Sequence, residues 1–166
     1  ADRIVFNAAQ LAISWAAEHV PAILEAWEPG SEGGNAVADI LFGDVNPGGK
    51  LPVTFPRRTG QAPLYYARTL THSPEGSMMY NPRYWDGPVS PLYPFGFGLS
   101  YTAFSIDNLK VSIPQVKVGG SLAITADVAN TGSLQGDEVV QLYIHQKAGS
   151  DSRPMRELKG FERVTL

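Results

Sequence analysis

A chain of 166 residues with a formal net charge of −3 and no cysteine excludes several kinds of protein at once. Without cysteine there are no disulfides and no thiolate metal sites, and the charge gives no electrostatic reason to bind nucleic acid or an anionic membrane surface. No stretch reaches the ~18–20 apolar residues that a membrane span needs. The 17 glycines and 13 prolines predict many turns and few long helices, in one ordinary domain or two small ones.

The first residues alternate between strand and helix patterns. Residues 3–7 form an apolar run that predicts a buried strand of the parallel type. The Ala-rich residues 8–20 predict a helix, and residues 22–27 predict a second short strand. This order indicates an α/β layered region with a parallel sheet. Because the chain starts directly on a strand, we expect elements that precede it to be missing.

The segment 29–52 combines a glycine-rich loop, a short helix and a second loop. Ser31 is the expected N-cap, and the carboxylate of Glu32 would complement the positive end of the helix dipole. Gly43 is expected to end the helix in the left-handed conformation, and residues 46–49 to form a tight turn. Four apolar residues share one helical face, which we therefore expect to be buried: Val37, Ile40, Leu41 and Val45.

Residues 51–56 are expected to be extended, because prolines bracket them. Both helical and strand periodicity then fade over residues 57–94, which predicts a long connection rich in proline and aromatic residues. Its aromatic side chains either stack on sugar rings or pack between domains, and we favour packing because aromatic rings more often supply buried area. The same choice applies to two tryptophans that precede the connection. The aromatic residues are Trp15, Trp27, Tyr65, Tyr66, Tyr80, Tyr84 and Trp85. Arg83 and Asp86 are expected to fix the connection rather than to touch a ligand.

After Ala103 the apolar pattern changes to period two, which predicts strands over 104–113, 122–128, 139–144 and 158–166. A phase slip at Asn108 suits a β-bulge. An inward-facing row is expected on the third strand: Val140, Leu142 and Ile144. These strands predict a β-sandwich, which needs about seven strands and is therefore incomplete here. Its open face and edges would favour self-association.

Several motifs, in this order, resemble glycoside hydrolase family 3 β-glucosidases. They are WEPGSEGGNAVADILFGDVNPGGKLPVTFP, QAPLYY, RYWD, PLYPFGFGLSYT, VANTG, GDEVVQLY and RPMRELKGFE. The resemblance implies that residues 1–60 form the end of an α/β sandwich domain and residues 61–103 a connecting segment. Residues 104–166 would be the first part of a fibronectin type III-like β-sandwich. The resemblance also implies that the chain is the C-terminal portion of a retaining enzyme that is periplasmic or secreted. This enzyme would hydrolyse terminal non-reducing β-D-glucosyl residues of β-glucosides or oligosaccharides, and it would need no metal or organic cofactor.

No catalytic residue is assigned to this chain. A retaining glycosidase needs two carboxylates about 5–5.5 Å apart, and the resemblance places the nucleophile in an N-terminal barrel and the acid/base before Ala1. Glu32 is the candidate substrate-binding residue, because a glycine-rich loop after a strand is where α/β sheets bind ligands. The interpretation that we favour is nevertheless a structural carboxylate that complements the dipole at the helix N-terminus.

Other reactive side chains lack the pattern that their chemistry needs. His19, His72 and His145 contain no i, i+4 pair, so no metal site is predicted. Residues 30–34 lack the phosphate-loop patterns, and no cofactor is expected. Lys50 is expected to be a turn lysine. Ser31 and Ser100 lack a nucleophile-elbow context, and a solvated strand edge is expected for the basic residues Arg153, Arg156, Lys159 and Arg163.

Two alternatives of other classes stay open. The chain could be a non-catalytic accessory or carbohydrate-binding module that uses exposed aromatic rings or sheet edges. It could also be a minimal enzyme with a new carboxylate pair, drawn from Glu25, Glu28, Glu32, Asp39, Asp44 and Asp86. The sequence does not separate a glucosidase from a xylosidase.

Overall fold

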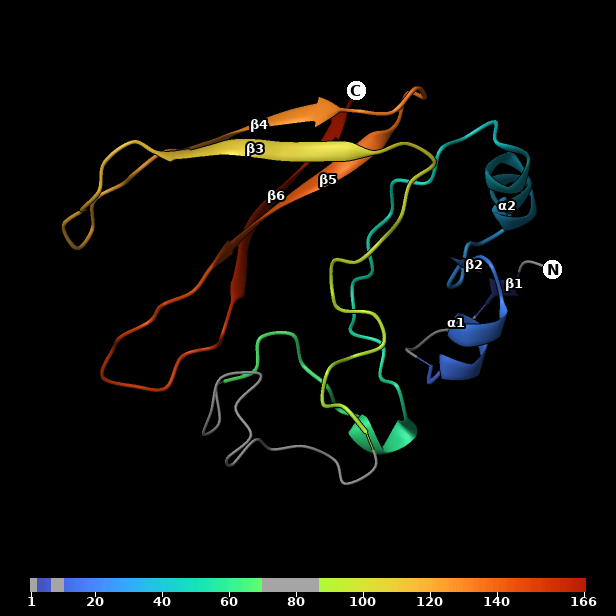
Figure 1. Ribbon diagram of the computed structural model, residues 1–166, viewed down its shortest axis with the longest axis horizontal. Helices are drawn as coiled ribbons and strands as arrows, with labels where there is room; N and C mark the ends of the chain where they lie inside the picture. Colours follow the sequence, from blue (N-terminus) through green and yellow to red (C-terminus); the bar gives the residue numbers. More distant parts are fainter. Residues whose placement is uncertain (1–2, 7–10, 70–86) are drawn as a thin grey trace.

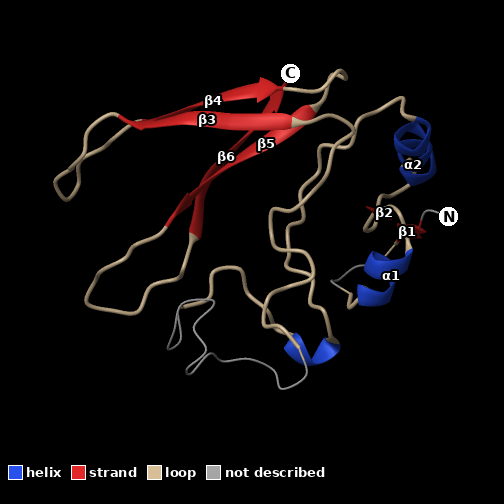
Figure 2. Ribbon diagram, in the orientation of Figure 1, coloured by secondary structure: helices blue, strands red, loops and turns tan. Residues whose placement is uncertain are grey.

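The computed structural model describes residues 3–6, 11–69 and 87–166. An α/β unit, a long connection and two antiparallel strand pairs follow one another along the chain (Figures 1 and 2). The first part contains β1 (Arg3–Val5), α1 (Ser14–His19), β2 (Ile23–Glu25) and α2 (Gly33–Phe42), and a short 3-10 helix (Thr59–Gln61) lies in the connection. The last part contains β3 (Phe104–Val111), β4 (Ile124–Asn130), β5 (Asp137–Ile144) and β6 (Glu157–Thr165).

The expected strand–helix–strand unit is present at the N-terminal end. β1 and β2 pair in parallel, with Ile4 opposite Leu24. α1 is shorter than the predicted helix over 8–20, because it begins only at Ser14. The hydroxyl of Ser14 donates a hydrogen bond of 2.8 Å to the carbonyl of Arg57, so the start of this helix is tied to the connection.

The N-terminus of α2 differs from the prediction. Its N-cap is Glu32 rather than Ser31, and no side chain caps it. The backbone explains the difference, since the N–H of Gly33 donates to the carbonyl of Gly30 in a turn that closes just before the helix.

The C-terminal end of α2 confirms the role of Gly43, which adopts the left-handed conformation with φ 85°. The predicted turn at 46–49 is wrong: the chain turns at once after the helix, where the N–H of Val45 donates to the carbonyl of Asp39. The predicted buried face is only half right. Val37 and Ile40 are half-buried, whereas Leu41 and Val45 are 45% and 49% exposed, because no described element covers that side of the helix.

The most buried part of the molecule lies where the extended segment 51–56 pairs with the connection. Two extended stretches, 51–55 and 92–97, run antiparallel, and the N–H of Phe55 donates to the carbonyl of Tyr93 at 2.8 Å. Phe55 is 1% exposed, and the ring of Trp27 meets it edge-on at 5.9 Å between centroids. The extended 51–56 segment is therefore confirmed. The predicted packing of the aromatic rings is confirmed for Trp27 and for Tyr66, which stacks on Phe95, and is wrong for Trp15 and Tyr65, which are 62% and 71% exposed.

The two antiparallel ladders are separate: β3 pairs with β4, and β5 pairs with β6. The predicted bulge is confirmed, because the register shifts between Asp107 and Lys110 and Asn108 has φ 52°. The predicted inward row on β5 is only partly right. Val140 is half-buried, whereas Leu142 and Ile144 are 36% and 45% exposed. The side chains of Gln141 and Tyr143 instead contact the connection, at Gly96 and Tyr66.

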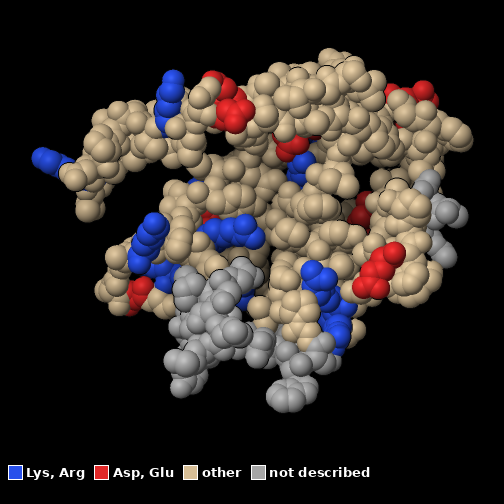
Figure 3. Space-filling model, viewed as in Figure 1, with Lys and Arg blue, Asp and Glu red and all other residues tan. Residues whose placement is uncertain are grey.

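The solvent-accessible surface, of which Figure 3 shows one face, is large for a chain of this mass. It measures 12002 Å² for 17.9 kDa, whereas a compact monomer of that mass exposes roughly 8,000 Å². Apolar side chains account for part of the excess, for example Phe42 at 84% and Phe161 at 71% exposed. Within the described residues, no helix is long and apolar enough to cross a membrane.

Candidate functional site

Three groups of side chains stand out where the connection meets the α/β unit and the strand ladders. The first is a junction cluster, defined as Asn46, Lys50, Ser100, Tyr101 and Glu138. The second is an aromatic cluster, defined as Tyr66, Phe95, Tyr143 and Arg156. The third is a pocket between the connection and the start of β6.

Asn46 is the polar centre of the junction cluster. Its side-chain oxygen accepts hydrogen bonds from the hydroxyl of Ser100 and from the N–H of Tyr101, both at 2.8 Å. Its amide nitrogen donates to the carbonyl of Gln135 at 3.1 Å. The phenol of Tyr101 donates in turn to the carbonyl of Ile40 in α2. One asparagine thus ties the segment after α2 to the entry of β3 and to the turn before β5.

Lys50 supplies the ionic part of the same cluster. Its ammonium group lies 2.9 Å and 3.0 Å from the two carboxylate oxygens of Glu138 in β5, and it donates to the carbonyl of Gly98 at 3.0 Å. The two charged side chains are only 13% and 15% exposed. The prediction that Lys50 is a turn lysine is therefore wrong: it is a partly buried link across 88 residues of sequence.

The aromatic cluster lies on the face of β5 that meets the connection. Tyr66 stacks on Phe95 with centroids 4.2 Å apart and meets Tyr143 edge-on at 6.2 Å. The guanidinium of Arg156 lies 5.7 Å from the centroid of the Tyr143 ring. Burial raises the pKa of Tyr143 above its usual value, Arg156 opposes that increase, and Tyr66 adds to it. The Tyr143 hydroxyl donates to the side-chain oxygen of Gln141 at 2.5 Å.

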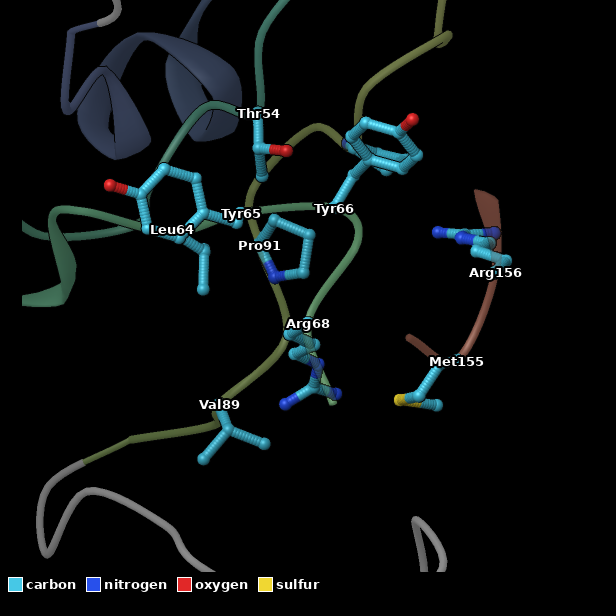
Figure 4. A pocket seen from close by; sticks show the side chains of 10 residues that line it. Thr54, Leu64, Tyr65, Tyr66, Arg68, Val89, Pro91, Met155 and Arg156 are labelled. Carbon is cyan, nitrogen blue, oxygen red and sulfur yellow. The ribbon is translucent and has the colours of Figure 1, made fainter. Parts of the chain in front are cut away.

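A pocket of about 230 Å³ lies beside this cluster. Tyr65, Tyr66 and Arg68 line it from one part of the connection, and Val89 and Pro91 from another. Met155 and Arg156 close it from the segment that leads into β6 (Figure 4). Aromatic, apolar and cationic groups therefore face one concave space.

Glu32, the candidate substrate-binding residue, is exposed at the start of α2. Its carboxylate accepts a hydrogen bond of 2.7 Å from the amide of Asn35. Glu28, Asp39 and Asp44 are also exposed, while the carboxylate of Glu25 accepts a hydrogen bond from the N–H of Trp27. Arg83 and Asp86 lie outside the described residues.

Other predicted groups are placed as follows. Trp15 is 62% exposed and stacks on His19 at 4.8 Å, and Tyr65 is 71% exposed. Among the described residues, no three His, Asp or Glu side chains gather as a metal site would require, and His72 falls outside them. Tyr80, Tyr84 and Trp85 also fall outside them.

The basic residues near the end of the chain follow the prediction of a solvated edge. Lys159 pairs with Glu157 at 3.1 Å and Arg163 with Asp137 at 3.5 Å, all on exposed or half-exposed side chains. Arg156 differs, because it is both a pocket residue and a neighbour of the Tyr143 ring.

Sequence reasoning missed the roles of Asn46, Glu138 and Arg68. One signal pointed to the junction, namely the glycines in PFGFG. A Cβ at Gly98 would collide with the carbonyl oxygen of Gly49, and Gly96 has φ 79° and would meet the Gln141 side chain. These glycines mark places where backbones approach closely, but they do not name the polar partners.

Two regions of the chain match known protein domains. Residues 3–101 match the glycosyl hydrolase family 3 C-terminal domain, and residues 138–166 match the fibronectin type III-like domain. The fold and the two matched domains together define the C-terminal region of a glycoside hydrolase. The chain belongs to glycosyl hydrolase family 3.

Similar proteins include a periplasmic β-glucosidase of Salmonella typhimurium, 45% identical over 98% of this chain and 22% of the relative. A β-xylosidase of Formosa agariphila is 43% identical over the same shares of the two chains. The crystal structure of a β-glucosidase from Listeria innocua in complex with glucose superposes with a TM-score of 0.91, at 40% identity, over 99% of this chain and 23% of that one. The chain thus spans about a fifth of the length of these relatives.

Proposed function

We propose that this chain is the C-terminal part of a retaining β-glucosidase that hydrolyses terminal non-reducing β-D-glucosyl residues. The observation that carries the proposal is the superposition over 99% of the chain on a β-glucosidase whose structure was solved with glucose. The related Salmonella enzyme is named for the same activity and for the periplasm, so we propose a periplasmic or secreted location. Because another relative is named a β-xylosidase, a β-xyloside is the alternative substrate.

The same proposal divides the chain into three parts. Residues 1–60 would close an α/β sandwich domain, residues 61–103 would connect, and residues 104–166 would begin a fibronectin type III-like β-sandwich. The parallel pairing of β1 with β2 and the antiparallel ladders support this division. The accessible surface of 12002 Å² also supports work within a larger protein, because other domains would cover the apolar side chains that are exposed here.

The role that we propose for this part is to hold the α/β domain against the fibronectin-like domain. Asn46 and the Lys50–Glu138 pair are suited to it, because they bond directly across the two parts of the chain. Catalysis would use two carboxylates of the complete enzyme and no metal or organic cofactor. Positioning of the reacting groups to within about 1 Å governs rates, so a brace of this kind would affect turnover without touching substrate.

Glu32 remains our candidate for contact with substrate. It is exposed on a loop that follows β2 and leads into α2, a place where α/β sheets bind ligands. Replacement by Gln keeps the size of the side chain and removes its charge. The variants are made in a chimera in which this chain replaces the matching segment of a complete relative. We expect Glu32→Gln to raise the KM of that chimera for an aryl β-glucoside, whereas Glu28→Gln, which changes a neighbouring exposed carboxylate, leaves KM unchanged. Equal KM values in both variants would leave Glu32 with a structural role.

The proposed function is tested in a chimera in which this chain replaces the matching segment of the Salmonella periplasmic β-glucosidase. We expect the chimera to hydrolyse a chromogenic aryl β-glucoside, and the 166-residue chain alone to show no turnover above a heat-treated control. The same relative without the segment is the matched control. A folded chimera without activity would contradict the proposal, and turnover by the isolated chain would point to a new carboxylate pair.

A second candidate function is that of a non-catalytic accessory or carbohydrate-binding module. The exposed rings of Tyr65 and Trp15 favour it, since aromatic faces stack on sugars. Saturable binding of sugar by a chain that stays inactive in the chimera would support it. We also propose that the chain self-associates through its exposed strand edges. A measurement of its molecular mass in solution tests this.

A further inference from the structure

The pocket beside the aromatic cluster is built from two segments that are far apart in sequence and directly bonded to each other. The N–H of Met155 donates to the carbonyl of Arg68 at 2.9 Å, and an antiparallel bridge joins Thr69 to Pro154. Tyr66 adds a third link, because its hydroxyl accepts a hydrogen bond from the N–H of Leu158 in β6. These bonds hold the two walls of the pocket at a fixed separation.

Two guanidinium groups face this pocket. Figure 4 shows Arg156 turned toward Tyr66, and Arg68 between Val89 and Met155. The described residues that line the pocket include no Asp or Glu, and neither arginine has an ion-pair partner among the described residues. The pocket is thus locally cationic in a chain with a net charge of −3.

The other walls of the pocket offer aromatic and apolar surface on which the ring of a ligand can stack. Tyr65 is 71% exposed, so most of its ring is available for stacking. Leu64 and Pro91 provide apolar surface next to it. The volume of about 230 Å³ is below the roughly 300–1,000 Å³ of pockets for drug-sized ligands, which limits the occupant to about one ring.

We propose that this pocket binds a carboxylated sugar, a uronic acid residue. Its carboxylate would take charge-assisted hydrogen bonds from Arg68 and Arg156, since guanidinium donors match carboxylate geometry. Its pyranose ring would lie on the face of Tyr65. Arg156 is already held in place by the Tyr143 ring, so little conformational freedom would be lost when the ligand binds.

A neutral sugar would leave both guanidinium groups without an anionic partner. The pocket should therefore discriminate between two sugars that differ only at carbon 6. We expect methyl β-D-glucuronide to bind about 10- to 100-fold more tightly than methyl β-D-glucoside, the range that charge-assisted hydrogen bonds supply. Because the attraction is partly ionic, the affinity should fall as salt is added.

The test is a titration of the full purified chain with methyl β-D-glucuronide, followed by NMR saturation transfer. Methyl β-D-glucoside supplies the ring without the carboxylate, and acetate supplies the carboxylate without the ring. We expect Arg68→Met and Tyr65→Ala each to weaken glucuronide binding at least tenfold. The matched control is Arg163→Met, because Arg163 pairs with Asp137 at the other end of β6 and should leave binding unchanged.

Three results would overturn the inference: no glucuronide binding, equal affinity for the two sugars, or unchanged binding in Arg68→Met. Acetate binding as tight as that of glucuronide would mean a carboxylate site without a sugar and would overturn it too. Near-UV circular dichroism reports whether the aromatic rings stay ordered. If the isolated chain loses that signal, the same titration in the chimera decides. The proposed function is read from turnover and this inference from binding, so each can fail without the other.

Discussion

Removing the ammonium group of Lys50 should open the junction between the segment after α2 and β5. In Lys50→Met the carboxylate of Glu138, only 15% exposed, loses its ion-pair partner, and the carbonyl of Gly98 loses a donor. Breaking a buried ion pair on one side costs about 3–5 kcal/mol. Because both side chains keep some contact with water, we expect about 2–4 kcal/mol here.

Hydrogen exchange in the chimera measures this loss locally. The backbone amides of Leu51 and Gly96 pair the two extended stretches beside Lys50, so their protection reports opening of the junction. A loss of 2–4 kcal/mol corresponds to exchange that is about 30- to 700-fold faster. Peptides from β4 are the internal control and should keep their protection.

A second variant separates the pair from the rest of the packing. Lys50→Met combined with Glu138→Met removes both charges, and replacing a buried pair by apolar groups of similar volume is often nearly neutral. The double variant should therefore regain most of the protection that Lys50→Met loses. Unchanged protection in Lys50→Met, or a double variant no better than the single one, would refute the reasoning.

Three further predictions concern stability. Gly43→Ala should lower the free energy of unfolding by about 1–2 kcal/mol, because Gly43 adopts the left-handed conformation. Gly34→Ala should raise it by about 0.5–1 kcal/mol, because a methyl group at Gly34 on α2 meets open space; urea midpoints that shift in the same direction in both variants would contradict this pair of predictions. Phe55→Ala should cost about 3–5 kcal/mol by the same measurement, and a cost under about 1 kcal/mol would mean that Phe55 is not at the core. Because burial raises the pKa of Tyr143 above its usual value of 10, stability should fall as pH rises above 10. Arg156→Gln should raise that pKa further, as tyrosinate absorbance will show, and an unchanged or lower pKa would contradict the assignment.

Local features of the fold were predictable from the sequence because single residues determine them. Gly43 ends α2, and Asn108 occupies the bulge in β3, both with positive φ. Glycine and asparagine adopt that conformation at little cost. The strand pattern after residue 103 likewise needs only neighbouring side chains. Element positions therefore followed from short stretches of sequence.

Burial was less predictable, because it depends on what covers each face. Leu41 has the spacing of a buried helical face and is 45% exposed, and Leu142 has the spacing of a buried strand row and is 36% exposed. Periodicity identifies an apolar side of an element but not the element that packs on it. Among the described residues, no element covers either of these two side chains.

The candidate site was the least predictable part, because its residues are distant in sequence and follow no period. Lys50 and Glu138 are 88 residues apart, and the sequence offered a glycine-rich turn as the simpler explanation for the lysine. Arg68 had no motif of its own. It lines the pocket beside Met155, a residue of a distant segment whose N–H donates to the carbonyl of Arg68.

The claim that this part of the chain holds the α/β domain against the fibronectin-like domain is tested most directly by the activity of the chimera with Asn46→Ala. This change removes three hydrogen bonds that join the segment after α2 to the rest of the chain. The matched control is Asn35→Ala, which removes one bond within the exposed start of α2. We expect Asn46→Ala to shorten the half-life of aryl β-glucosidase activity on heating at least tenfold and to lower kcat/KM, with the control close to the unaltered chimera. Equal half-lives and equal kcat/KM in the two variants would contradict the claim that this part of the chain holds the enzyme together.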